Sequence, residues 1–172
     1  MLRVACSAHN ARAFKAARDW LEHCGLQVAV HAVGESIPGS YWGEPEAGLV
    51  RDTVHVRADT PLHSLLHEAS HALCMGADRR ARLYRDAGGD DIEESAVCYL
   101  QLCIAREIEA IGEHTLARDM DAWGYSFRAG STLAWFTADA QDARDWLIAR
   151  PHLTSLLPAT FPSSDVASEA AC

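Results

Sequence analysis

The sequence predicts an α+β fold in which a small sheet packs against two buried helices. Three observations predict it: two strand-like segments in the first third of the chain, a long apolar helix carrying the letters H-E-x-x-H, and a second apolar helix after it. The 172 residues are enough for one hydrophobic core. We expect a single domain over residues 1–157 and a loose tail over residues 158–172, because the tail residues are mostly small and polar.

Composition restricts the environment and the partners of this protein. Hydrophobic residues make up 49% of the chain and charged residues 23%, as in ordinary globular domains. The net charge of -9 offers no basic surface for phosphates, so nucleic acid is not an expected partner. We expect no membrane association, because no apolar run could span a bilayer and the first residues lack the apolar segment of a secretory signal. Three of the six cysteines lie in predicted helices and no C-x-x-C pair occurs, which indicates a cytoplasmic protein with reduced thiols.

The first elements are one helix and two strands. Residues 10–23 have apolar side chains at helical spacing, which predicts an amphipathic helix. Residues 26–33 are rich in β-branched side chains and predict a strand. Residues 53–57 alternate between apolar and polar side chains, so they predict a second strand that leads directly into the H-E-x-x-H helix.

Two polar segments are predicted to be loops. Residues 34–48 hold four glycines and two prolines. Tyr41 and Trp42 at the centre of this loop either line the rim of a pocket or anchor the loop on the core. Residues 76–89 form a polar connection with four arginines, which either lie on a solvated face or contact an acidic group of a substrate.

The central helix is predicted over residues 60–76, TPLHSLLHEASHALCMG. Asp59 or Thr60 can cap its start. Pro61 suits the first turn, and Gly76 suits the end. A broad stripe of leucine and alanine predicts that this helix is buried.

The second half of the chain is predicted to be helical. Residues 91–112 form the second buried helix, for which Asp91 is the expected N-cap. Shorter helices are expected over residues 112–123 and 139–149. The aromatic segment between these two helices is interrupted by glycines and receives no assignment.

The H-E-x-x-H letters suggest a metal site. His67 and His71 are four residues apart on a helix, so both imidazoles can reach one ion. Glu68 points towards an adjacent position, from which a carboxylate can move a proton. The alternative is that these are ordinary hydrogen-bonded histidines, because so short a pattern also arises by chance.

A third ligand is expected at the start of the second buried helix. Glu93 shares the apolar face of that helix, and a buried carboxylate needs a cation beside it. Glu94 lies three residues after Asp91, where its carboxylate can bind the backbone of the cap. We therefore favour Glu93 as the third ligand over Glu94, and consider His63, one turn before His67, a residue of the outer site.

Two metals suit two histidines and one carboxylate. Zinc would lower the pKa of a bound water to about 7, and Glu68 would act as the general base of a hydrolase. With iron(II), the same three ligands form the facial triad of non-haem oxygenases. Because the ligands lie on two helices, the arrangement favours a zincin-like core of the mini-gluzincin type with either metal.

Residues 66–80, LHEASHALCMGADRR, resemble the elongation factor P hydroxylase family of metal enzymes, which modify a lysine-derived side chain of that translation factor. The resemblance includes L-H-E-x-S-H, the glycine at 76, and paired arginines. The family's second helix begins with aspartate, an aliphatic residue and glutamate, as DIE does here. A weaker resemblance, carried by EESA over residues 93–96, is to small gluzincin metallopeptidases.

The first resemblance implies a function and a set of residues. It implies that His67, His71 and Glu93 bind the metal and that Glu68 lies beside it. Residues that also match the pattern, or that lie near it and could bind substrate, are Ser70, Arg79 and Arg80. The chain is shorter than the family after these arginines, and its last third matches poorly. We expect a hydroxylase acting on a protein side chain, for example of a translation factor; the alternatives are a zinc metallopeptidase and a noncatalytic metal-binding protein.

Overall fold

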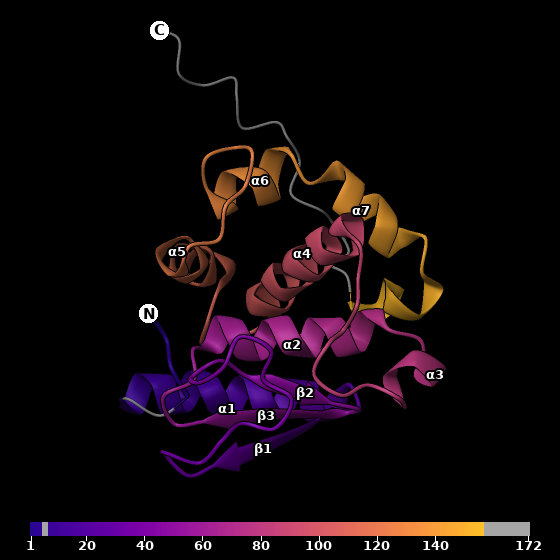
Figure 1. Cartoon of the computed structure of the whole chain (residues 1–172). Coiled ribbons are helices and arrows are strands. Elements are labelled where there is room, and N and C mark those ends of the chain that lie inside the picture. The colour runs from indigo at the N-terminus through magenta and orange to yellow at the C-terminus, as the bar shows by residue number, and fades with distance from the viewer. Residues whose placement is uncertain (5–6, 157–172) are drawn as a thin grey trace, which may run out of the picture.

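The computed structural model describes residues 1–4 and 7–156, and the fold over these residues is α+β. The described residues form three strands, seven α-helices and one 3-10 helix (Figure 1). In chain order these are α1 Ala8–His23, β1 Gln27–His31, β2 Gly48–Val50, β3 Thr53–Arg57, α2 Leu62–Cys74, α3 Ala77–Arg80, α4 Asp91–Glu107, α5 Glu113–Trp123, α6 Thr132–Ala138, α7 Gln141–Ile148 and the 3-10 helix Pro151–Leu156.

The sheet has the order β1-β3-β2, with β3 at its centre. β1 pairs with β3 in parallel, and β2 pairs with β3 antiparallel. Val54 and Val56 alternate along β3 and are fully buried, because this face of the strand turns towards the helices. The strand β2 begins at Gly48, the last residue of the predicted loop over residues 34–48, and its three residues are too few to form a recognisable pattern.

Helix α2 lies between the sheet and α4, so it is covered on both sides (Figure 1). Leu62, Leu65 and Leu66 have no exposed surface and the other apolar residues of α2 are also buried, which confirms the predicted buried helix. The predicted side-chain cap is wrong. Thr60 Oγ1 accepts a hydrogen bond from the backbone N–H of Arg57 at 2.9 Å, and the carboxylate of Asp59 binds the guanidinium of Arg57. Both side chains therefore stabilise the turn before the helix.

Helix α4 begins at Asp91 as predicted, but it has a different N-cap and ends at Glu107, before the predicted end at residue 112. The N-cap is Asp90, whose Oδ1 accepts a hydrogen bond from the backbone N–H of Glu93 at 2.8 Å. The expected cap, Asp91, lies inside the first turn, where its charge still favours the helix N-terminus. Glu93, and not Glu94, is therefore the third residue after the cap.

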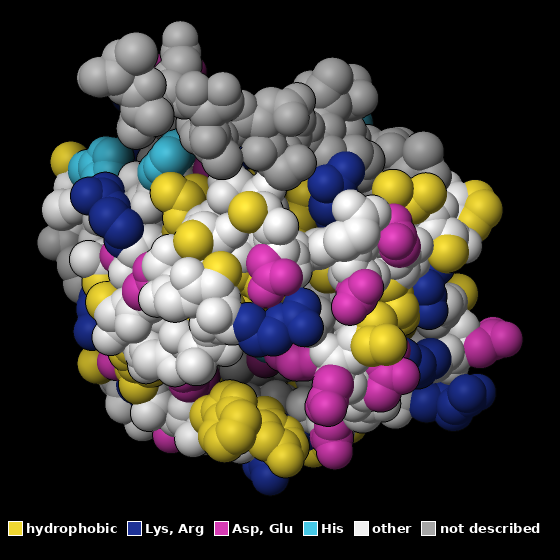
Figure 2. Space-filling model, turned by 90° about the horizontal axis from the view of Figure 1, so that it is seen from above, with side chains coloured by type: hydrophobic (Ala, Val, Ile, Leu, Met, Phe, Trp, Pro, Cys, Tyr) yellow, Lys and Arg dark blue, Asp and Glu magenta, His cyan; other side chains and the backbone are white. Residues whose placement is uncertain are grey.

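The remaining elements follow the prediction in part. Helices α5 and α7 lie where short helices were expected, and α6 occupies the segment that received no assignment. The proposed tail over residues 158–172 lies outside the described residues. Within the described part of the chain, no helix is both long and apolar enough to cross a bilayer. On the face seen in Figure 2, acidic and basic side chains are interspersed among apolar ones.

Candidate metal centre

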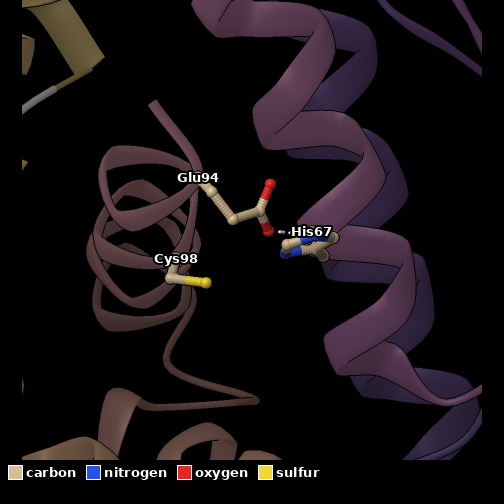
Figure 3. A group of neighbouring side chains, drawn as sticks. All are labelled: His67, Glu94 and Cys98. Atoms are coloured by element: carbon tan, nitrogen blue, oxygen red, sulfur yellow. Dashed lines mark ion pairs between the residues drawn. The ribbon is translucent and has the colours of Figure 1, made fainter. Parts of the chain in front are cut away.

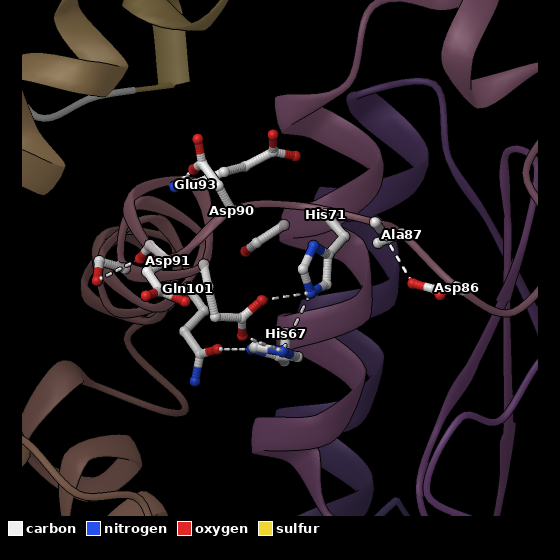
Figure 4. Close-up of polar contacts among 12 residues, drawn as sticks. His67, His71, Asp86, Ala87, Asp90, Asp91, Glu93 and Gln101 are labelled. Atoms are coloured by element: carbon white, nitrogen blue, oxygen red, sulfur yellow. Dashed lines mark hydrogen bonds and ion pairs between the residues drawn. The ribbon is translucent and has the colours of Figure 1, made fainter.

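Two facing helices bring the candidate ligands together. His67 and His71 project from α2 towards α4, and Glu94 projects from α4 towards them (Figures 3 and 4). His71 lies beside Glu94, whereas His67 also contacts Gln101, two turns further along α4. The two helices therefore run in opposite directions, and one face of each supplies the site.

Three side chains, His67, His71 and Glu94, form what we call the ligand triangle; its facing atoms are two imidazole nitrogens and both oxygens of one carboxylate. The Nε2 atoms of His67 and His71 are 3.2 Å apart. Glu94 Oε1 lies 3.1 Å from Nε2 of His67, and Glu94 Oε2 lies 3.4 Å from Nε2 of His71. Ligands held at about 2.0–2.1 Å from one ion are about 3.3 Å apart in a tetrahedron and about 3.0 Å apart in an octahedron. Each of these three separations is thus close to the distance between neighbouring positions around a metal ion.

Gln101 orients the first histidine. Nδ1 of His67 lies 2.9 Å from Oε1 of Gln101, and Nε2 of Gln101 is directed at the sulfur of Met120. Because the amide oxygen can only accept a hydrogen bond, Nδ1 of His67 carries the proton. Nε2 is therefore the nitrogen that would face a metal ion once it loses its own proton, and the proton on Nδ1 fixes the tautomer that a metal requires.

The protonation of the cluster also suits a cation. Burial lowers the pKa of His71 to about 4, so its imidazole is neutral. Burial works in the same direction on His67, but the neighbouring Tyr125, Cys98 and Glu94 outweigh it and hold the pKa of His67 above its usual value. Burial disfavours the ionised form of Glu94, yet its contact with His67 lowers the pKa of the carboxyl. One proton is therefore held among three ligands, and a divalent cation could displace it.

Glu93 does not face the histidines, so its predicted place in the site is wrong. Its carboxylate binds Arg79, with Nη1 at 2.7 and 2.9 Å from the two oxygens, and Arg79 also donates to the carbonyl of Ala87. A Cβ added to Gly89 would lie 3.2 Å from Glu93 Cδ, so the loop closes directly over this side chain. The buried carboxylate does have a cation beside it, but the cation is a guanidinium. The position expected for Glu93 is occupied by Glu94.

The other residues singled out from the sequence have structural contacts. The hydroxyl of Ser70 donates to the carbonyl of Leu66 at 2.8 Å, within α2. Arg80 donates to the carbonyl of Ala72 at 3.0 Å and pairs with Asp52. These contacts tie α2 to its surroundings and leave neither side chain in the site.

His63 is fully buried and lies outside the ligand triangle. Its ring packs 5.2 Å from that of Trp123 and 5.7 Å from that of Tyr125, and both ring nitrogens lack a hydrogen-bond partner among the described residues. Burial lowers its pKa to about 3, so this imidazole is neutral.

Cys98 is a site residue that the sequence analysis did not identify. It lies one turn after Glu94 on α4, and ligand atoms of His67, Glu94 and Cys98 all lie within 4.8 Å of one another (Figure 3). The signal was present in the sequence, since Glu94, Cys98 and Gln101 share one helical face. A cysteine among apolar neighbours on a helix also has the pattern of a small core residue, so the sequence alone does not single out Cys98.

A pocket of about 210 Å³ opens beside the triangle. Glu68 lines it together with both histidines and Glu94, and burial raises the pKa of Glu68 to about 7. A carboxyl group with this pKa can exchange a proton near neutral pH. The rest of the wall consists of Tyr41, Trp42, Arg85, Asp86, Ala87, Gly88 and Gly89. The ligand triangle is therefore accessible to a ligand from outside.

Comparison with known proteins finds no match to a family model, to a curated protein or to a solved structure.

Proposed function

We propose that this chain is a metal-dependent enzyme whose ion is bound by His67, His71 and Glu94. One observation carries the proposal: the facing atoms of these three side chains lie 3.1–3.4 Å from their neighbours at the wall of an open pocket. A bound ion in this place would act as a Lewis acid or activate a small molecule. We also infer a zincin-like core, since the H-E-x-x-H helix lies between a small sheet and a helix that supplies a glutamate.

Glu68 is the residue to which we assign proton transfer. Glu68 follows His67 on α2 and lines the same pocket, but it is not one of the three side chains of the ligand triangle. With a pKa of about 7, it can accept a proton from a group in the pocket and return it in a later step. Gln101 holds the imidazole of His67 in the tautomer that leaves Nε2 available.

For the reaction, we infer hydroxylation of a protein side chain with iron(II), dioxygen and an external two-electron reductant: one oxygen atom would enter a C–H bond, and the other would leave as water. Two histidines and one carboxylate are the ligands of non-haem iron oxygenases. The segment LHEASH with the following glycine and paired arginines resembles the elongation factor P hydroxylase family. The third ligand is now assigned to Glu94 in place of Glu93. The ligands are still two histidines and one carboxylate, because both residues are glutamates at the start of the same helix.

A zinc hydrolase is the second candidate, and the placement of Glu68 favours it. A general base beside an open coordination position is the arrangement by which zinc peptidases activate water.

Metal analysis and one variant test the proposal. Protein purified anaerobically should contain one ion per chain, iron for the hydroxylase and zinc for the hydrolase. Glu68→Gln should keep the metal and abolish hydrolysis, because it removes a base and no ligand. Metal-free protein that binds neither ion would contradict the metalloenzyme. One bound ion that is needed for folding, with no reaction sensitive to Glu68→Gln, would instead favour a noncatalytic metal-binding protein.

A further inference from the structure

The four arginines between α2 and α4 do not share one role. Arg79 is bound by the carboxylate of Glu93, and Arg80 donates to the carbonyl of Ala72. Arg85 lines the pocket beside the ligand triangle, and within the described part of the chain its side chain forms no ion pair or hydrogen bond. Of the arginines that the sequence places near the motif, Arg85 is thus a cation that faces the pocket and is available to a ligand.

The backbone around Arg85 is held in place. Arg85 has φ of 77°, a left-handed conformation that residues other than glycine rarely adopt. Its N–H donates to the carbonyl of Leu49 at 3.1 Å, and Tyr84 pairs with Val50 in an isolated bridge. Two residues after Arg85, the carbonyl of Ala87 accepts a hydrogen bond from the guanidinium of Arg79 on α3. The loop is therefore anchored on both sides of Arg85, so the arginine starts from a fixed point on the pocket rim.

Two exposed aromatic residues form another part of the same wall. Tyr41 is 54% exposed and Trp42 is 80% exposed, and their rings meet edge to face at 5.1 Å. The loop that carries them is braced by a hydrogen bond from the N–H of Gly43 to the hydroxyl of Ser40 at 3.1 Å. Large aromatic side chains held at a pocket rim are typical of surfaces that bind an apolar group.

We propose that Arg85 binds a carboxylate of the substrate, while the apolar group next to that carboxylate lies against Tyr41 and Trp42. The remaining part of the substrate then points towards Glu68 and Glu94. An acid would be repelled by a chain of net charge -9 unless a local cation received it, and Arg85 supplies that cation with two parallel donors. The pocket of about 210 Å³ is smaller than the roughly 300–1,000 Å³ of sites for drug-sized ligands, so it takes one residue or one small acid. This inference rests on the proposed function, because it names the substrate class of the same site.

Calorimetric titration with matched probes tests the subsite. The small-acid probe is 3-phenylpropionate, and its amide is the uncharged control. N-acetylphenylalanine and N-acetylphenylalaninamide form a second pair, which represents the carboxyl-terminal residue of a peptide. Arg85→Met should weaken binding of both acids by roughly tenfold or more and leave both amides unchanged. Arg85→Lys should retain part of the affinity, since it keeps the charge but loses the second donor.

Arg82→Met is the matched control variant. It removes the same charge from the same segment, but Arg82 does not line the pocket, so acid binding should change by no more than about twofold. Equal losses in the Arg82 and Arg85 variants would show that general charge attraction holds the acid, and would overturn the proposal. Binding of only one of the two acids would support the subsite proposal. It would also show whether the carboxylate comes from a small acid or from the carboxyl terminus of a peptide.

A fourth variant separates this proposal from the proposed function. In His67→Ala, which removes a metal ligand, the acids should still bind in a manner that depends on Arg85. Suppose that the acids bind the zinc-loaded unsubstituted protein and the zinc-loaded Arg85→Met variant equally well, but do not bind His67→Ala. The carboxylate then binds the ion, so the proposed subsite is wrong and the metal centre stands. If no metal binds but acid binding still depends on Arg85, the proposed function fails and the subsite stands. Absence of acid binding to the zinc-loaded unsubstituted protein would refute the subsite.

Discussion

Two adjacent glutamates provide a direct test of the metal centre. Glu94→Gln and Glu93→Gln each replace one carboxylate by an amide of nearly the same shape, one residue apart on α4. Glu94 Oε1 and Oε2 lie 3.1 and 3.4 Å from the two imidazole nitrogens, whereas Glu93 is bound by Arg79. We therefore expect Glu94→Gln to weaken metal binding strongly and Glu93→Gln to leave it nearly unchanged.

The size of the effect follows from the role of each carboxylate. Loss of a residue that only supports a metal ligand costs about 10–100-fold in affinity, so loss of Glu94 itself should cost at least about 100-fold, or about 2.7 kcal/mol. Glu93→Gln leaves the guanidinium of Arg79 without its ion-pair partner. Because that guanidinium is 39% exposed, the cost to folding should be only about 1 kcal/mol, which lowers the melting temperature by about 2–4 °C.

Competition against a chromophoric chelator, with zinc as the probe, measures the affinities. Thermal unfolding in excess chelator measures the stabilities separately. The reverse pattern, with tight metal binding in Glu94→Gln and weak binding in Glu93→Gln, would refute the assignment and restore Glu93 as the ligand. Equal affinity in both variants and the unsubstituted protein would show that the ion binds elsewhere.

Three further predictions concern the residues around the triangle. Gln101→Leu should lower zinc affinity by about 10–100-fold while the fold persists in circular dichroism, because His67 loses the acceptor that sets its tautomer; unchanged affinity would contradict this role. Cys98→Ala should keep one Co²⁺ per chain, because His71 and not Cys98 completes the triangle. For the same reason, the unsubstituted protein loaded with Co²⁺ should lack a strong sulfur-to-cobalt absorption band. A band that the substitution removes would make Cys98 a ligand. Burial lowers the pKa of His63 from 6.5 to about 3, so below pH 6.5 the unfolded chain binds a proton more readily than the folded protein. The free energy of unfolding should therefore fall as the pH drops from about 6.5 to about 3, by up to about 1.4 kcal/mol per pH unit. His63→Leu should flatten this dependence in urea unfolding at several pH values, and parallel curves would mean that His63 does not control it.

The sequence by itself determined the elements whose signals are local. The spacing of His67 and His71 depends on helix geometry alone, and an apolar stripe of leucines identifies α2 as a buried helix wherever it packs. The strand β3 was predicted with the bounds that the structure has, because alternation over five residues is a local signal too. Elements with short or ambiguous patterns, such as β2 and α6, were not predicted.

Only the tertiary structure decided which acid faces the histidines. On the sequence, Asp90 and Asp91 are both good caps, and Glu93 and Glu94 differ by a rotation of about 100° around the helix. The choice depends on a partner distant in sequence: Arg79 binds Glu93 and holds it under the loop, which leaves Glu94 to α2. The same holds for Arg85 and Trp42, which reach one pocket wall from loops more than forty residues apart. A pattern along the chain specifies the face of an element, but the neighbour that this face meets depends on how distant segments pack.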